Sequence, residues 1–244
     1  MALALLPSTR STAGPYEAAH AAHLRGDYRT YFGIIRPLAA RGEARAQADL
    51  CACYIEGEGV PQDYAIAITL CRSAASKGDA LANFNLGILY QEGRGVARND
   101  ALAASWFRKA AELGDASAAA NLGAMYATGA RGVPQDYSQA IYWTQKAAAQ
   151  GFALAQSNMG VFYSKGAGVK QDYKLAAEWY LKAANQGDAD GELHLGIAYD
   201  GGEGVGRDRA RAVMWLQKSA AQGNLWAKSY LAVTNLRDAF HDAS

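Results

Sequence analysis

The segment Ala155–Gly187 reads AQSNMGVFYSKGAGVKQDYKLAAEWYLKAANQG, and close copies of it precede and follow it along the chain. Its central Gly168 recurs at steps of 36, 37, 36 and 36 residues, in the series Gly59, Gly95, Gly132, Gly168 and Gly204. A fixed period of this size is typical of a supersecondary unit that buries its apolar face only against neighbouring copies. The sequence therefore predicts an all-α solenoid of stacked antiparallel helix pairs.

The repeat divides the 244 residues into units. We expect five full repeats, at 44–79, 80–115, 116–152, 153–188 and 189–224. Because terminal repeats are usually atypical, residues 15–43 are interpreted as a degenerate N-terminal capping helix pair and 225–240 as a C-terminal capping helix. Residues 1–14 lack a basic n-region, so two interpretations stay open: a disordered tail, or the remnant of a trimmed export signal. The compartment, a bacterial-type cytoplasm or periplasm, is likewise left open.

Each repeat assigns most of its residues to structure. The first helix reads A-x-x-x-L-G-x-x-Y, whose spacing keeps these residues on one helical stripe. In the turn G-x-G-V-x-x-D, the first glycine suits a left-handed helix end and the aspartate suits an N-cap. The second helix reads A-x-x-W-x-x-K-A-A, and we expect its tryptophans in the core and its lysines to complement the helix dipole. These residues are Trp106, Trp143, Trp179 and Trp215, with Lys109, Lys146, Lys182 and Lys218.

Composition excludes several classes of function. The formal net charge is +1 and no cluster of Lys and Arg occurs, which argues against a nucleic-acid partner. No segment approaches the roughly 20 apolar residues of a membrane span. The turn glycines follow helices rather than strands and lack a suitable lysine, so they do not form a phosphate loop. His20 and His23 lie three apart with no further ligand, so we expect a solvated helix face, no metal and no cofactor. We expect a monomer.

Three cysteines, Cys51, Cys53 and Cys71, lie in the first full repeat. Cys51 takes the place of the glycine that follows leucine in the other repeats. Antiparallel pairing is expected to put Ala67 opposite Cys51, which leaves Cys71 about one turn further along. Because a disulfide needs Cα atoms within roughly 7 Å, the sequence predicts three free thiols.

The combined pattern A-x-x-x-L-G-x-x-Y-x-x-G-x-G-V-x-x-D-x-x-x-A-x-x-W-x-x-K-A-A-x-x-G resembles the Sel-1-like repeat family, a relative of the tetratricopeptide repeats. The resemblance covers roughly 44–236 and implies a right-handed α-α superhelical solenoid. It also implies a non-catalytic scaffold or adaptor that holds a peptide or partner protein on its concave face. The alternative is β-lactam binding or hydrolysis, with which some cysteine-rich members of the family are associated. This chain lacks their repeated cysteines, and no serine with a positioned base is visible, so we expect no enzyme.

Function is expected at inward positions of the first helices that the shared pattern leaves unassigned. One such position carries an amide or a ring in four successive repeats: Asn85, Asn121, Asn158 and His194. Asp49 precedes this series and Tyr230 follows it. Because an amide both donates and accepts, the series is predicted to bind a peptide backbone or a carboxylate. Apolar neighbours are predicted to form a floor beside it: Phe84, Ile88, Val161, Leu193 and Ile197. In the other interpretation, the amides recur only with the repeat and the apolar residues are ordinary core.

Overall fold

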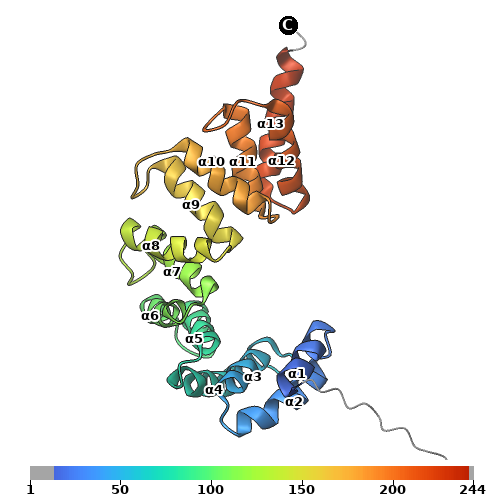
Figure 1. The fold of residues 1–244 in the computed structure, drawn as a ribbon, viewed down its shortest axis with the longest axis vertical. Coiled ribbons are helices and arrows are strands. Elements are labelled where there is room, and N and C mark those ends of the chain that lie inside the picture. Colours follow the sequence, from blue (N-terminus) through green and yellow to red (C-terminus); the bar gives the residue numbers. More distant parts are fainter. Residues whose placement is uncertain (1–13, 242–244) are drawn as a thin grey trace, which may run out of the picture. The chain divides into compact units, whose positions relative to one another are not determined.

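The computed structural model describes residues 14–241, with side chains through residue 233. Within that range the chain forms thirteen helices and no strand (Figure 1). The proposed tail or export-signal remnant at 1–14 lies outside the described residues, apart from Gly14. The helices are α1 (Pro15–Leu24), α2 (Tyr28–Ala40), α3 (Ala44–Glu56), α4 (Tyr64–Ser76), α5 (Ala80–Glu92), α6 (Asp100–Glu112), α7 (Ala116–Thr128), α8 (Tyr137–Ala149), α9 (Ala153–Lys165), α10 (Tyr173–Ala184), α11 (Ala189–Gly201), α12 (Arg209–Ala221) and α13 (Leu225–His241).

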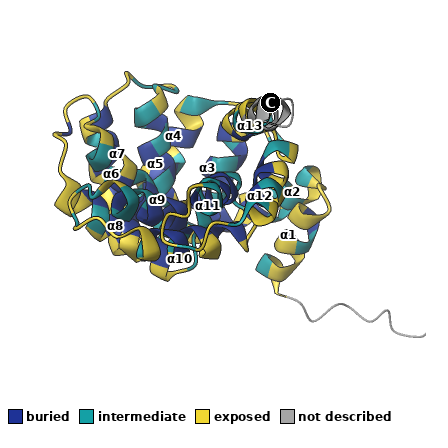
Figure 2. Ribbon diagram, turned by 90° about the horizontal axis from the view of Figure 1, so that it is seen from above, coloured by how far each residue is buried: buried dark blue, intermediate teal, exposed yellow. Residues whose placement is uncertain are grey.

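The helices form two compact units, residues 1–98 and residues 99–244. Within each unit, the two helices of a repeat pack together, as α3 does on α4 and α9 on α10. The second helix of a repeat also packs on the first helix of the next repeat, as α4 does on α5 and α10 on α11. The buried residues gather where neighbouring helices face each other (Figure 2). The predicted all-α fold of stacked helix pairs is confirmed.

The turn between the paired helices is fixed by local hydrogen bonds. In the repeat that begins at Ala153, α9 ends at Gly166, whose φ of 65° and ψ of 28° are left-handed. The side chain of Asp172 then caps α10 by accepting from the backbone N–H of Leu175. The backbone N–H of Asp172 also donates to the carbonyl of Tyr163 at 3.0 Å, which closes the turn. The same cap recurs at Asp63, Asn99, Asp136 and Asp208, as the sequence predicted.

The second glycine of the turn joins one repeat to the preceding one. Gly168 has a φ of +75°, and a Cβ atom built on it would lie 2.6 Å from the Cβ of Tyr137 in the first turn of α8. The equivalent Gly204 lies against the backbone of Tyr173 in the first turn of α10. Since real Cβ atoms do not approach so closely, a side chain at Gly168 would push the two repeats apart.

The glycine within the first helix sets how closely the paired helices approach. A Cβ atom at Gly160 would overlap the ring of Tyr180, and one at Gly196 would lie 2.7 Å from the Cγ of Leu216. Tyr180 and Leu216 both come four residues after the small alanine of the second helix. The residue that faces the glycine therefore lies one helical turn beyond the alanine.

The same register corrects the expectation for the cysteines. Cys51 occupies the glycine position and faces Cys71 rather than Ala67, and the two cysteines form a disulfide with a Cα–Cα distance of 5.6 Å. The prediction of three free thiols was wrong because it placed the paired helices one turn out of register. Cys53 is a free, buried thiol, and burial raises its pKa to about 12.

The tryptophans of the second helices are only partly core. Trp143 and Trp215 are buried, 4% and 9% exposed, whereas Trp106 and Trp179 are half-buried. In all four repeats the lysine three residues later lies over the ring of its tryptophan, with Nζ between 4.0 and 4.9 Å from the ring centroid. These lysines therefore make cation–π contacts and cover the partly exposed rings.

Replacing Gly168 with alanine is expected to destabilise the chain more than replacing Gly187 with alanine. Both glycines have left-handed backbones, with φ of +75° and +80°, so each substitution costs about 1–2 kcal/mol of backbone strain. Nothing lies within 4 Å of a Cβ atom at Gly187, so the overlap with Tyr137 adds about 1–3 kcal/mol only at Gly168. Urea denaturation of both variants measures the difference. Equal midpoints would contradict the proposed contact between repeats.

Reducing the disulfide is expected to lower the free energy of unfolding by about 3 kcal/mol, as for a loop of similar length, since its cysteines are 20 residues apart. Urea denaturation with and without a thiol reductant measures this loss. The double variant Cys51→Ala with Cys71→Ala should no longer respond to the reductant, whereas Cys53→Ala should respond like the unmodified chain. A response that Cys53→Ala abolishes would mean that another pair of cysteines is bridged.

Candidate functional site

The series of amides predicted from the sequence does not present one uniform surface. Asn85 in α5 is only 9% exposed, and its Nδ2 atom has no hydrogen-bond partner in the described part of the chain. The half-buried Asn121 in α7 donates from Nδ2 to the carbonyl of Ser117 in the same helix, at 3.0 Å. The half-buried Asn158 in α9 has no hydrogen bond from its amide to any described residue. Of the three amides, the one at Asn158 is therefore the best placed to bind an incoming group.

Asn158 lines a hollow between α7 and α9. The hollow has a volume of about 150 Å³, and its other walls are Val161 and Phe162 of α9 and the end of α7 around Thr128. Thr144 of α8 lies beneath it. The site thus combines one open amide with apolar side chains from two successive first helices.

His194 lies in a second, smaller hollow of about 90 Å³, formed by α9, α10 and α11. Its ring stacks on that of Tyr180, with centroids 4.9 Å apart and an interplanar angle of 24°. The hydroxyl of Tyr180 lies 3.0 Å from Oγ of Ser164, and Glu203 closes the hollow from the following turn. His194 is thus enclosed by side chains of its own and the preceding repeat.

Burial shifts the pKa values of both His194 and Tyr180. It lowers the pKa of His194, since the charged imidazolium is poorly solvated there. Lys165 also lowers the pKa of His194, whereas Asp190 and Asp188 oppose the shift. Burial raises the pKa of Tyr180 above its ordinary value. The ring of His194 is therefore favoured in its neutral form.

Two of the five apolar positions predicted beside the amides serve both packing and the hollows. Val161 packs against the core cluster around Tyr180 and Leu195, and it also lines the hollow at Asn158. Ile197 packs against the cluster around Leu216 and also lines the hollow at His194. Leu193 is buried. Phe84 and Ile88, in α5, are half-buried. The two interpretations of these residues are therefore not exclusive.

The site residues are divided between the two units. Asn85, Phe84 and Ile88 belong to residues 1–98, whereas the residues from Asn121 onward belong to residues 99–244. Tyr180 was not predicted from the sequence, because it lies in a second helix, whereas the predicted site residues all lie in first helices. Its position faces the helix glycine and varies from repeat to repeat, through Cys71, Phe107, Thr144, Tyr180 and Leu216. The residue at this position changes in every repeat while the pattern around it stays largely constant, and this variation indicates a position that could contribute to function.

The described residues hold no group of three or more His, Cys, Asp or Glu side chains that could bind a metal ion. His20 and His23 are exposed on α1, and Nε2 of His23 lies 3.6 Å from the carboxylate of Glu58. In the part of the chain with described structure, no helix is long and apolar enough to cross a membrane.

Comparisons with known proteins place the repeats in one family. The family model described as Sel1 repeat matches residues 44–79, 80–115, 116–152, 153–188 and 189–224. These boundaries coincide with those of the five repeats predicted from the sequence. A comparison with curated proteins gave no match.

Solved structures agree with this match. A Sel1 repeat protein from Oxalobacter formigenes is 32% identical, with a TM-score of 0.80, over 88% of this chain and 86% of that one. The protective antigen c5321 of uropathogenic Escherichia coli, which displays an SLR fold, is 37% identical with a TM-score of 0.77. That likeness covers 88% of this chain and 47% of the antigen. The immunity protein PA5088 of Pseudomonas aeruginosa shares only the fold, at 19% identity and a TM-score of 0.58, over 91% of this chain and 85% of that one.

Lowering the pH is expected to destabilise the folded chain through His194. The unfolded histidine takes up a proton as the pH falls through about 6.5, whereas the buried ring resists protonation, so the stability contributed at neutral pH is lost on acidification. Urea midpoints at about pH 7.5 and 5.5 measure this loss. His194→Asn introduces the residue of the three preceding repeats and should reduce the pH dependence. An unchanged pH dependence in that variant would contradict the assignment to His194.

Proposed function

Because the chain belongs to the Sel1 repeat family, we propose that it is a non-catalytic scaffold that binds a peptide or a partner protein along its first helices. The repeat uses its glycines, alanines, tyrosines and capping aspartates for structure. Specificity then falls to the variable positions of the first helices. Such proteins bind partners through extended surfaces that stacked repeats create.

The hollow at Asn158 is the observation that carries this proposal. Its open amide offers both a donor and an acceptor, which is the complement of a peptide group. The half-buried Val161 lies beside it and offers apolar contact to a side chain of the partner, and the buried Phe162 also lines the hollow. Asn121, one repeat earlier in α7, holds the equivalent position. An extended or helical segment that crosses α7 and α9 would therefore meet polar and apolar groups together.

The alternative of β-lactam hydrolysis has less support. A serine hydrolase needs a base within hydrogen-bond reach of the nucleophile. Ser164 is the serine nearest to a histidine ring in the hollows described above, but its Oγ contacts the hydroxyl of Tyr180 and the carbonyl of Val161. His194 stacks on Tyr180 and has no hydrogen bond to Ser164. We therefore propose no reaction, and expect no saturable turnover of the chromogenic β-lactam nitrocefin.

Replacing Asn121 and Asn158 together with alanine should weaken capture of the partner. Each lost hydrogen bond costs about 1 kcal/mol, so the pair should reduce affinity by roughly tenfold or more. The partner is obtained by affinity purification from the source organism, and its binding to the unmodified and variant chains is then compared by calorimetry.

A matched control is Asn185→Ala, which removes an exposed amide at the end of the second helix α10. This variant should bind the partner like the unmodified chain. The double variant should keep its melting temperature, because the amide of Asn121 bonds only within its own helix and that of Asn158 has no partner among the described residues. Unchanged affinity, or a melting temperature lower by many degrees, would contradict a role of these amides in binding.

A further inference from the structure

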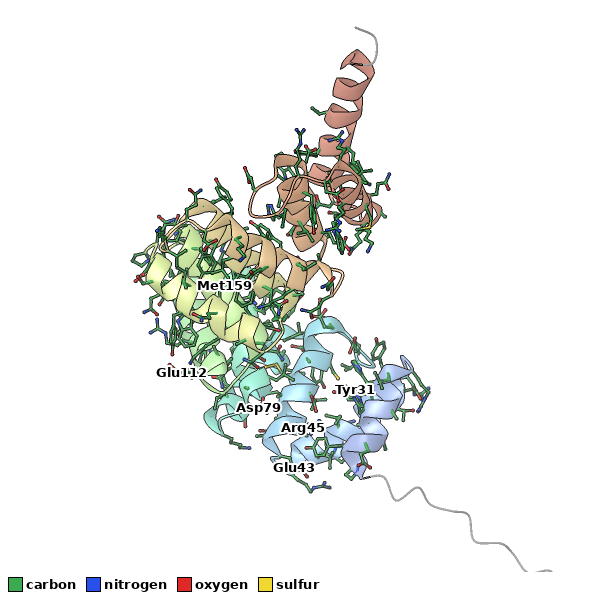
Figure 3. The ribbon with its side chains drawn as sticks, turned by 45° about the horizontal axis from the view of Figure 1, so that its top comes forward. Tyr31, Glu43, Arg45, Asp79, Glu112 and Met159 are labelled. Carbon is green, nitrogen blue, oxygen red and sulfur yellow. A yellow bond between two sulfur atoms is a disulfide. The ribbon has the colours of Figure 1, made fainter. Side chains whose placement is uncertain are left out.

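A third hollow lies in the unit of residues 1–98, among α1, α2 and α3 at the side of α5. Its volume is about 340 Å³. Figure 3 labels two of the residues that line it, Tyr31 on α2 and Arg45 on α3. The lower limit for small-molecule sites is about 300 Å³, so this hollow has room for one long side chain and its neighbouring backbone rather than for a large ligand.

Asp49 is the acidic group that lines this hollow. It lies on α3, is half-buried, and has no ion-pair partner within 4 Å among the described residues. The side chain of Tyr31 favours its charged form and so lowers the pKa of Asp49. Arg45, one turn earlier, is near enough to favour its charge, but that guanidinium lies over the ring of Tyr16, 4.7 Å from the centroid. The carboxylate of Asp49 thus faces the hollow without a cation bound to it.

The walls of the hollow suit the rest of a basic side chain. The rings of Tyr16 and Tyr31 line it. Because Arg45 already lies over the ring of Tyr16, the ring of Tyr31 is the one that attracts an incoming cation near its face. Leu81, which is 38% exposed, adds apolar surface against which an aliphatic stem packs. Arg45, His20 and His23 also line the hollow. Its carboxylate, the ring of Tyr31 and the apolar surface of Leu81 together complement an ammonium or guanidinium group on a hydrocarbon chain.

We propose that this hollow, lined by Asp49, Tyr16 and Tyr31, binds the basic side chain, arginine or lysine, of a partner peptide. Asp49 holds on α3 the repeat position that Asn158 holds on α9. The hollow therefore uses, in its own unit, the position of the first helix from which the proposed function expects a partner to be bound. The inference rests on the proposed function only for the source of the cation. Recognition of the cation stands on the residues of the hollow itself.

The peptide Ac-Ala-Ala-Arg-Ala-Ala-NH₂ is titrated into the full chain, and its binding is measured from the chemical shift changes in NMR spectra. The control peptide carries citrulline, which has the shape of arginine without its charge. We expect saturable shifts at Tyr16, Tyr31 and Asp49, and binding at least ten times weaker with citrulline. Equal affinity for the two peptides, or shifts confined to α7 and α9, would overturn the proposal.

Two further arms locate the source of the cation and the residue that binds it. Agmatine carries a guanidinium on an aliphatic stem without peptide groups, and tighter binding of agmatine than of the peptide would overturn the assignment to a peptide.

Asp49→Asn should weaken binding of the arginine peptide at least tenfold, whereas Asp190→Asn, an exposed position in the other unit, should not. Unchanged binding by Asp49→Asn would also overturn the proposal. If the double variant of Asn121 and Asn158 captured the partner normally, that result would contradict the proposed function but not the binding of a cation at Asp49.

Asp49→Asn should fold at least as well as the unmodified chain. Burial raises the pKa of Asp49, as does Asp79, against the opposing effects of Arg45, Tyr31 and His23. A raised pKa means that folding disfavours the carboxylate, so its protonated form stabilises the fold at low pH and this contribution is lost as the pH rises through the folded pKa. The melting temperature of Asp49→Asn at pH 7 should therefore not fall. The citrulline comparison on the unmodified chain decides the proposal whatever the stability of the variant.

Discussion

The absence of a side chain at two glycines, which four of the five repeats share, is the constraint on which the other contacts depend. In the repeat of α9 and α10, Gly160 lets the paired helices meet, and Gly168 lets the turn lie against the first turn of the preceding α8. Each contact brings backbone to within van der Waals distance of a neighbour, where a Cβ atom has no room. The N-cap at Asp172 and the turn that its backbone closes at Tyr163 then orient α10.

The residue that faces the helix glycine is where the repeats differ most. A thiol at Cys71 bonds covalently to Cys51, because a cysteine has replaced the glycine there. The ring of Tyr180 fills the same position three helix pairs later in the other unit, and there it supports His194 and shapes a small hollow. The backbone of the helix pair is thus similar in each repeat, whereas the buried residue that faces the helix glycine differs. The hollows at Asn158 and His194 are lined by this position, through Thr144 and Tyr180, as well as by residues of the first helices.

Most of the fold was predictable because its determinants are local. The period, the left-handed glycine at Gly166 and the cap at Asp172 are each set within a few residues, so the sequence pattern contains them. The pairing of Cys51 with Cys71 was not predictable, because it depends on a shift of one helical turn between two packed helices. Nor did the pattern show that Asn85 is buried or that Asp49 lines a hollow, since both depend on neighbouring elements. The hollow at Asp49 also includes α1 and α2, which do not follow the period.

The disulfide between Cys51 and Cys71 links the two helices of a single repeat. It therefore ties α3 to α4 but places no covalent restraint on how that pair moves against α5. The noncovalent contacts between repeats, such as that of Gly95 with Tyr64, remain the compliant joints of this unit. When the repeats of this unit move against one another, the bridged pair should move as one rigid segment, with the displacement taken up at its borders. The redox state of the disulfide should therefore change the stiffness of this one helix pair.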